Sequence, residues 1–342
     1  MSKRKRIVVI GGGSGIFNIL KGLKNYPLDI SAVVTMFDSG GSSGILRDEF
    51  GIWPAGDLRR CLGALADDKY ERFFNDLLEL RFKKTSSLGG HKFGNIFLLA
   101  LANTVGNDAL AIKKAEEILR VKGRVLPVSL DRSHLSARLE NGQIIEGETN
   151  IDVPKHDGSL RIDQVFLNPC ARIHDETELA IMEADLIVLG PGDMYTSIIP
   201  NLLVEGMPRA LQKSNAKKIL VMNLTTKWGE TNGFTASHFA GEALYYSGLE
   251  EFDYIICNNN TERLEREFIG EKNQPVSVDA QLRHYTKKII AANLLSEKFV
   301  RHDPQKMGEI LDNIATSPRA LASQPSHFLH VKAPNLAPDP RF

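Results

Sequence analysis

Short apolar runs alternate with longer segments of helical periodicity along most of the chain. This alternation is typical of a parallel β-sheet covered by helices. We expect strands at residues 7–10, 30–36, 184–189, 217–222, 252–257 and 288–295. We expect helices at residues 17–23, 58–66, 95–102 and 109–119. The pattern therefore predicts an α/β fold.

Two of the expected helices have clear starting points. Leu58, Leu62 and Leu65 recur at positions i, i+4 and i+7 and so share one face. Asp57 directly precedes this helix, where an N-cap residue stands. The segment 95–102 is apolar on every side, which predicts a buried helix opened by Asn95.

One segment departs from the alternation. Two β-like runs flank Asn141 and Gly142, a residue pair typical of a tight hairpin turn. We interpret residues 125–170 as a small β-rich insertion, or flap, on the α/β core. Residues 1–315 are then a single Rossmann-like three-layer domain with a mostly parallel sheet, and the proline-rich residues 316–342 an extended tail.

The composition narrows the classes of partner. The chain has 342 residues, of which 42 are basic and 42 acidic, so its formal net charge is zero. Nucleic acids and anionic membranes usually require a basic excess, and we expect neither as a partner. No apolar run approaches the roughly 18 residues of a membrane span. Three scattered cysteines without a CxxC pair indicate reduced thiols in a cytoplasmic protein.

The first strand is followed at once by a glycine-rich loop and then a helix. Such a loop can bind phosphate, because bare backbone amides approach the anion and the helix N-terminus favours negative charge. Tight packing of the backbone is the alternative explanation. The strict GxGxxG pattern is absent, since Ile16 or Asn18 stands where the last glycine belongs. The candidate residues are Gly11, Gly12, Gly13, Ser14 and Gly15.

A second glycine- and serine-rich loop follows the second strand. Asp38 stands where the acid of a dinucleotide-binding fold meets a ribose. The loop behind it suits a second phosphate, with Arg47 as an added charge, although a flexible surface loop would have the same composition. The candidate phosphate-binding residues are Ser39, Gly40, Gly41, Ser42 and Ser43.

Two further loops carry basic residues. Arg59 lies in the first turn of its helix, where it opposes the helix dipole, so we expect it to contact either a ligand or a carboxylate. His91, Lys92 and Asn95 lie in or directly after a second Gly-rich loop. We consider His91 either a plain hydrogen-bonding residue or an acid or base.

The loops after two later strands are rich in small polar side chains. In open α/β sheets, ligands bind outside the carboxyl ends of parallel strands, at the point where the chain reverses direction. These loops and the earlier ones should therefore meet at one edge and enclose a phosphate-bearing ligand. The later candidates are Gly190, Gly192, Tyr195, Thr196, Asn223, Thr225, Glu230 and Thr231.

Six of these stretches, taken together, resemble the YvcK/CofD-like family over roughly residues 6–315. They read GGGSG at 11–15, DSGGSSGILR at 38–47, PAGDLRRCLGAL at 54–65, GHKFGN at 90–95, GPGDMYTSIIPNLL at 190–203 and GETNGFTASH at 229–238. The resemblance implies a Rossmann-type fold. It also implies one of two branches, the 2-phospho-L-lactate transferases or the gluconeogenesis factors, which bind UDP-sugars and affect carbon metabolism and cell-wall growth.

The chain resembles the second branch more closely, but departs from its pattern at three places. Ala55 replaces a proline, Asp193 stands where serine is common, and Lys227-Trp228 replaces a Gln-Pro pair. A carboxylate at position 193 would repel a phosphate unless it holds a cation. The resemblance also makes Arg301 a candidate for a diphosphate or sugar contact, with a surface ion pair to Asp303 as the alternative.

We therefore weigh three functions. The first is a regulator that binds a UDP-sugar, forms a homodimer and acts on an unidentified protein partner. The second is a phosphoryl-type transferase in which Asp38 and Asp57 hold Mg²⁺ and Arg47, Arg59 or Lys92 stabilises developing charge. The third, an NAD-dependent dehydrogenase, explains only the first two loops and ranks last, although NAD can still be a bound dinucleotide.

Overall fold

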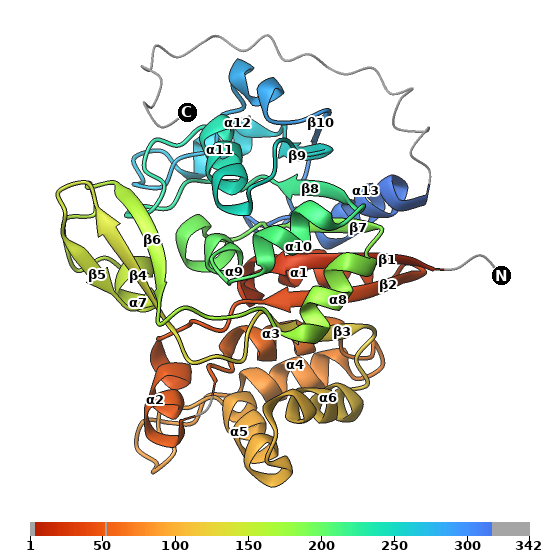
Figure 1. The fold of residues 1–342 in the computed structure, drawn as a ribbon, viewed down its shortest axis with the longest axis vertical. Helices are drawn as coiled ribbons and strands as arrows, with labels where there is room; N and C mark the ends of the chain where they lie inside the picture. Colours follow the sequence, from red (N-terminus) through yellow and green to blue (C-terminus); the bar gives the residue numbers. More distant parts are fainter. Residues whose placement is uncertain (1–3, 52, 317–342) are drawn as a thin grey trace.

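The computed structural model describes residues 4–51 and 53–316, and all structural statements concern these residues. Seven parallel strands form the central sheet, in the order β10-β9-β8-β7-β1-β2-β3 (Figure 1). The strands are β1 (Lys5–Gly11), β2 (Leu28–Val34), β3 (Arg124–Pro127), β7 (Leu186–Leu189), β8 (Lys217–Val221), β9 (Tyr254–Asn258) and β10 (Ile289–Ala292). All six strands predicted from the sequence are present.

The interior strand β1 lies where the two halves of the sheet meet. Its residues 7–10 are at most 2% exposed, as expected for a strand covered on both faces. From β1 the chain proceeds to β2 and β3 on one side, and it later returns to β7 on the other. The sequence of strands thus reverses direction at β1, which is where ligands bind in such sheets.

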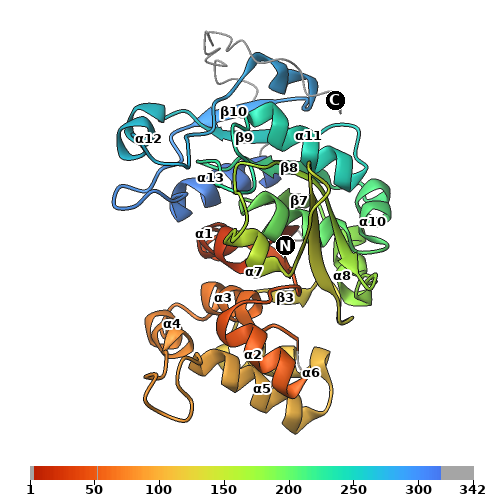
Figure 2. The same cartoon turned by 90° about the vertical axis from the view of Figure 1, so that its left-hand side faces the viewer.

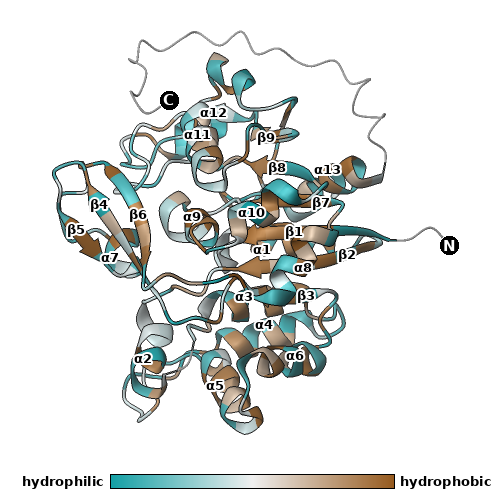
Figure 3. Ribbon diagram, in the orientation of Figure 1, coloured by the Kyte–Doolittle hydropathy of each residue, from teal (hydrophilic) through white to brown (hydrophobic). Residues whose placement is uncertain are grey.

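Helices cover both faces of the sheet, giving the three layers expected (Figure 2). On one side lie α1 (Gly13–Leu23), α3 (Gly56–Leu65) and α13 (Pro304–Thr316), and on the other α8 (Asp175–Glu183) and α10 (Met207–Lys213). Apolar residues line most of β1, β2 and β7 in the hydropathy view (Figure 3). Besides the short helix that follows β5 (Ile144–Glu146), the remaining helices are α2 (Gly41–Phe50), α4 (Glu71–Glu79), α5 (Phe93–Val105), α6 (Asp108–Leu119), α9 (Ile199–Leu202), α11 (Ala236–Ser247) and α12 (Thr261–Glu267), with a π-helical turn at Met194–Ile198 and a 3₁₀ turn at Ala280–His284.

A small antiparallel sheet stands beside the core, and it contains the predicted hairpin (Figure 1). Strands β4 (His134–Leu139) and β5 (Ile144–Glu146) flank Gly142, whose φ of 85° suits a glycine. Strand β6 (Ile162–Asn168) pairs with β4, and the short helix α7 (Glu148–Asp152) follows β5. Because β3 pairs with β2, the small sheet begins after β3.

Three local expectations were wrong. The glycine- and serine-rich stretch after Asp38 is a loop only as far as Gly40, because α2 already begins at Gly41. Helix α5 begins at Phe93 rather than Asn95, and only one side of it is buried. Asp57 lies in the first turn of α3 rather than at its N-cap, which is Ala55.

The predicted tail lies, beyond residue 316, outside the described residues. Among the described residues, no helix is long and apolar enough to cross a membrane. All three cysteines are free thiols, as expected, with Cys61 and Cys257 buried and Cys170 exposed.

Candidate functional site

The main groove lies at the carboxyl edge of the sheet, where the strand order reverses. Its volume of about 1120 Å³ is large enough for a nucleotide-sized ligand. The first turn of α1, the loops after β7 and β8, the segment around residue 301 and the α3–α4 wall enclose it. The structure brings together here the predicted residues Ser14, Gly15, Gly192, Asn223, Thr225 and Arg301.

The glycine loop after β1 is packed against two neighbouring segments. A Cβ atom on Gly13 would lie 2.4 Å from the backbone oxygen of Asp57, and one on Gly15 would lie 2.1 Å from that of Pro191. A Cβ on Gly12 would meet the Ser197 hydroxyl at 2.5 Å. Tight packing therefore accounts for these three glycines, while Ser14 and Gly15 also face the groove.

An asparagine from the loop after β8 forms hydrogen bonds with the backbone of the loop after β7. The side-chain amide of Asn223 donates to the backbone oxygen of Gly192 at 2.9 Å, and its oxygen lies 3.5 Å from the Gly192 nitrogen. The asparagine thus acts as a neighbouring strand would. It fixes the backbone of one groove wall, and the Gly192 backbone oxygen already has a hydrogen-bond partner without a ligand.

Three carboxyl groups from different segments, Asp38, Asp57 and Glu148, lie within electrostatic range of one another. Asp38 accepts a hydrogen bond from the Gly40 nitrogen at 2.7 Å, and Asp57 accepts one from Gly13. Burial, with the charge of Asp38, raises the pKa of Asp57 to about 7. Burial and the charges of Asp38 and Asp152 raise the pKa of Glu148, on α7, to about 8. The sequence reasoning did not single out Glu148, because no local signal in the sequence links the insertion to the loop after β2.

The insertion is attached to the loop after β2 through α7. The backbone nitrogen of Thr149 donates to the Ser39 hydroxyl at 3.0 Å, and that hydroxyl donates to Thr149 Oγ1 at 3.2 Å. The Ser39 nitrogen in turn lies 3.5 Å from Glu148 Oε2. Ser39 therefore contacts the insertion, and any movement of α7 involves this side of the site.

We expect the Glu148 carboxyl to make stability depend on pH. Its folded-state pKa lies above its ordinary value, so the folded protein keeps a proton that the unfolded chain releases. The associated stability is complete below the ordinary pKa and is lost as the pH rises through about 8. At pH 8.5, Glu148→Gln should therefore be more stable than the unsubstituted protein by about 1 kcal/mol, and near pH 4 the two should be equal.

Urea unfolding at pH 4, 6 and 8.5 measures this difference. Glu146 is exposed on the neighbouring strand, so Glu146→Gln is the matched control and should follow the unsubstituted protein at every pH. If Glu148→Gln and Glu146→Gln have the same pH profile, Glu148 is not a protonated buried carboxyl.

Arg59 and Lys92 are bound to the same carboxylate. The buried Arg59 guanidinium pairs with Glu79 and donates to the Leu78 backbone oxygen at 3.3 Å. The Lys92 ammonium lies 2.6 Å from the other oxygen of Glu79. Of the two partners expected for Arg59, a ligand or a carboxylate, the structure therefore has the carboxylate.

The two serines at the start of α2 join the same region from the other side. The amide of Asn95 donates to the hydroxyls of Ser42 at 3.1 Å and Ser43 at 3.3 Å. The His91 ring nitrogen Nδ1 lies 3.3 Å from the Ser42 hydroxyl, so His91 is a hydrogen-bonding residue here. Arg47 lies on α2, where it pairs with Asp48 at 3.1 Å. Outside the groove, these residues position α2 against α5.

A lysine lies among three carboxylates at the far end of the groove. Lys227 Nζ is 2.6 Å from Asp152 Oδ1, on the insertion, and 3.1 Å from Asp193 Oδ2. Asp152, Asp193 and Glu230 offer oxygens within 4.8 Å of one another. Burial lowers the pKa of Lys227, but these carboxylates outweigh it and raise the pKa above the ordinary value. The cation that Asp193 requires is therefore the Lys227 ammonium.

Glu230 also holds the loop after β7. It accepts hydrogen bonds from the Tyr195 nitrogen and the Thr196 hydroxyl, both at 3.0 Å. Burial, then the charge of Asp193, raises the pKa of Glu230 to about 8. The Thr231 hydroxyl accepts from the Lys227 nitrogen at 2.8 Å. These predicted residues thus fix the two loops to each other.

The acids that line the groove all have cationic partners. Asp68 and Glu71 pair with Lys24, Asp76 with Arg72, Glu79 with Lys92, and Asp193 with Lys227. In the described part of the chain, only two cations of the lining, Arg60 and Arg301, have no carboxylate ion pair.

Of these two arginines, only Arg301 was predicted from the sequence as a ligand contact. The Arg301 guanidinium lies 5.4 Å from the Phe299 ring, while Asp303, its alternative partner, accepts from the Lys306 nitrogen at 3.0 Å. Arg60 was not predicted as a site residue. Each residue turns a helix by about 100°, so Arg60 points away from the leucine face, whereas Arg59 borders it. That periodicity was the available signal.

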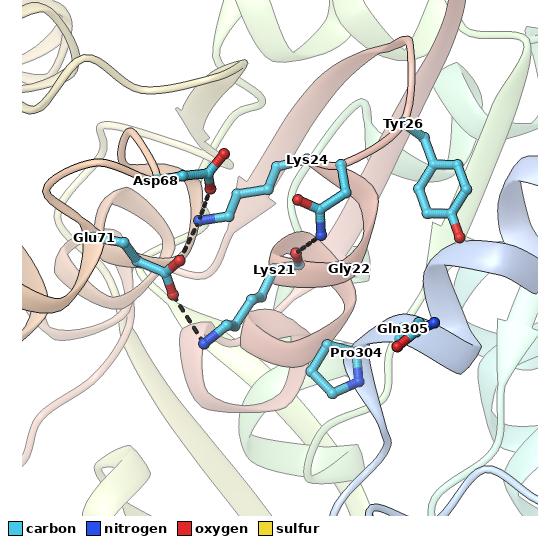
Figure 4. A pocket seen from close by; sticks show the side chains of 9 residues that line it. Lys21, Gly22, Lys24, Tyr26, Asp68, Glu71, Pro304 and Gln305 are labelled. Atoms are coloured by element: carbon cyan, nitrogen blue, oxygen red, sulfur yellow. Dashed lines mark hydrogen bonds and ion pairs between the residues drawn. The ribbon is translucent and has the colours of Figure 1, made fainter.

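A smaller cavity of about 490 Å³ adjoins the groove near the end of α1 (Figure 4). Lys21 and Lys24 point towards Glu71, each at 2.9 Å, and Lys24 also lies 3.1 Å from Asp68 (Figure 4). All four charged side chains of this cavity are thus paired with one another. The cavity offers no free charge to a ligand.

Comparisons with known proteins extend over most of the chain. Residues 7–295 match the family profile described as 2-phospho-L-lactate transferase CofD. A "Putative gluconeogenesis factor" of Thermoanaerobacterium thermosulfurigenes is 41% identical over 312 residues, which cover 90% of this chain and 95% of that protein. The "Gluconeogenesis factor" of Bacillus subtilis (strain 168) is 37% identical over 318 residues, covering 91% of this chain and 98% of that protein.

A solved structure agrees with the fold. The crystal structure of a UPF0052 family member from Bacillus halodurans has a TM-score of 0.83 and 36% sequence identity, and the match covers 91% of this chain and 99% of that one. These similarities confirm the resemblance inferred from the six sequence stretches and the α/β fold.

Proposed function

Since the chain belongs to the CofD family and is similar to proteins named gluconeogenesis factors, we propose that it is a regulatory protein that binds a nucleotide sugar of the UDP-sugar type. The observation that carries this proposal is the groove at the β1 reversal point. It has the volume for such a ligand, and its acids are already neutralised by neighbouring cations. In this proposal the protein, on binding the ligand, regulates carbon metabolism and cell-wall growth through a protein partner.

The groove offers different groups along its length. The first turn of α1, at Ser14 and Gly15, presents a helix N-terminus to a phosphate. Arg301 supplies a guanidinium, and Asn223 and Thr225 supply polar groups on the facing wall. We assign the diphosphate to the α1 end and the sugar to the loops after β7 and β8.

The regulatory part of the proposal rests on α7. This helix contacts Ser39 on one side of the site and, through Asp152, Lys227 on the other. Asp193 and Lys227 line the groove, so a ligand there lies next to the contact that holds the insertion. Ligand binding therefore shifts the balance between states of the insertion, provided that the ligand binds one of them more tightly.

A second candidate is a transferase, and the cluster of Asp38, Asp57 and Glu148 favours it. Oxygen ligands on neighbouring carboxylates suit Mg²⁺, so Asp38 and Asp57 would hold the ion. A bound Mg²⁺ would supply charge neutralisation for phosphoryl-type transfer. Within the described residues the basic groups proposed for developing charge, Arg47, Arg59 and Lys92, already have carboxylate partners. The regulator therefore ranks first.

The test is calorimetric titration with UDP-N-acetylglucosamine, with and without Mg²⁺, with NAD titrated in parallel. We expect saturable binding of UDP-N-acetylglucosamine, intact ligand in the recovered sample, and altered hydrogen exchange in α7. Consumption of the ligand, or binding of NAD alone, would contradict the regulator. If ligand is consumed, Asp38→Asn should abolish turnover but retain binding.

A further inference from the structure

Arg60 is a cation on α3 that lines the groove. We propose that Arg60 binds a phosphate group of the ligand and so sets the preference of the groove for phosphorylated nucleosides over nucleosides. This inference rests on the proposed function, because it assigns a residue to the diphosphate end of the same groove.

The first support is the charge state of the groove. Each acid of the lining has a lysine or arginine partner, so an incoming anion meets no unpaired carboxylate among the described lining residues. Arg60 has neither an ion pair nor a side-chain hydrogen bond within the described ranges 4–51 and 53–316. Its guanidinium therefore keeps its donors available, and their planar arrangement matches phosphate oxygens.

The second support is the contrast with the neighbouring arginine. Arg59 is buried, and its donors are used by Glu79 and the Leu78 backbone oxygen. Arg60 is half-buried and lines the groove. Two adjacent residues of the same helix thus have opposite roles, one holding α3 against α4 and the other facing the cavity.

The third support is the position of Arg60 relative to the first turn of α1. The Gly13 nitrogen donates to Asp57, which lies one helical turn before Arg60 on α3. Ser14 and Gly15 line the same groove as Arg60. A phosphate placed at the N-terminus of α1 therefore lies beside α3, from which Arg60 projects into the groove.

The carboxylates within electrostatic range of Arg60 are already engaged. Asp57 accepts the Gly13 N–H, and Glu79 holds both Arg59 and Lys92. The charge of Arg60 lowers the pKa of both carboxyls, but it forms a contact pair with neither. A half-buried guanidinium in this setting is screened less than a surface one, which strengthens its contact with a phosphate.

The experiment compares Arg60→Gln and Arg60→Lys with the unsubstituted protein by calorimetry. We expect Arg60→Gln to bind UDP-N-acetylglucosamine about 10- to 100-fold more weakly, the range for one charge-assisted contact. Arg60→Lys, which keeps the charge but loses the planar donors, should fall between the two. The affinity for uridine, which carries no phosphate, should be equal in all three proteins.

Arg172→Gln is the matched control. Arg172 lies outside the groove lining, with a side chain that is 80% exposed and pairs with Glu205 at 3.2 Å. Its replacement removes the same charge and should change the affinity less than about twofold. A loss as large as that of Arg60→Gln would show a general field effect and overturn the assignment.

Two failures can be distinguished. If UDP-N-acetylglucosamine binds the unsubstituted protein and Arg60→Gln equally, Arg60 is not a phosphate contact, while the proposed function stands. If the unsubstituted protein does not bind this ligand, the proposed function fails, and inorganic pyrophosphate tests Arg60 on its own. Pyrophosphate binding that is absent, or unchanged in Arg60→Gln, then overturns this inference as well.

Discussion

Replacing Gly15 by alanine is expected to lower the free energy of unfolding by about 3 kcal/mol and to abolish binding of UDP-N-acetylglucosamine. The added Cβ would lie 2.1 Å from the Pro191 oxygen and 2.7 Å from Gly192 Cα. Both are backbone atoms, so no side-chain rotation relieves the clash. The first turn of α1 must then move away from the loop after β7, and these two segments form adjoining walls of the groove. Urea unfolding and calorimetry measure the two effects.

Gly308→Ala is the control for this prediction. Its Cβ would lie 2.9 Å from the Gly22 oxygen and 2.7 Å from the Tyr26 ring, at the other end of α1. We expect it to be destabilising but to leave ligand affinity in the folded protein unchanged. If Gly15→Ala binds as tightly as Gly308→Ala, the close approach of α1 to the loop after β7 is not needed for the groove.

Replacing Lys227 by methionine is expected to destabilise the protein by about 2–3 kcal/mol at pH 8. The substitution leaves Asp152, Asp193 and Glu230, with oxygens within 4.8 Å of one another, without their shared cation. Glu230 is buried, so its repulsion from the other two is weakly screened. The loss should shrink towards pH 5, because burial raises the pKa of Glu230 to about 8, so that this carboxyl is protonated there and no longer repels the other two.

Urea unfolding of Lys227→Met and of the double variant Lys227→Met/Asp193→Asn tests this explanation. The double variant removes one of the repelling charges and should recover part of the lost stability at pH 8. A double variant that is no more stable than Lys227→Met would show that lost packing, and not charge, causes the effect. Equal stability of Lys227→Met and the unsubstituted protein would contradict the prediction outright.

The sequence predicted the frame of the site better than its individual contacts. Apolar strands followed by polar loops implied a parallel sheet with those loops at one edge, and the groove indeed gathers residues from Ser14 to Arg301 there. Helix α2 was missed because glycine and serine are poor helix formers. Hydrogen bonds from Asn95 on α5 to Ser42 and Ser43 help hold its first turn in place.

Ion pairing was the part that sequence reasoning could not reach. Asp193 and Lys227 were each noticed as departures from the family pattern, but only the folded chain shows that they neutralise each other, with Asp152 as a third member. Glu79, which engages both Arg59 and Lys92, carried no local signal at all. Such partners are far apart in sequence, so their pairing depends on the packing of helices and loops.

The interior place of β1 in the sheet also has a consequence for synthesis. Its neighbours are β2, which is synthesised directly after α1, and β7, which is synthesised only after the α2–α8 region that contains the insertion. At translation speeds of about 5–20 residues per second, one edge of β1 waits unpaired for on the order of ten seconds. During that interval the nascent chain exposes the apolar residues 7–10 on an unpaired strand edge, which favours chaperone binding or aggregation. The pairing of β1 with β7, which completes the reversal point at the groove, is thus the last strand pairing that β1 forms.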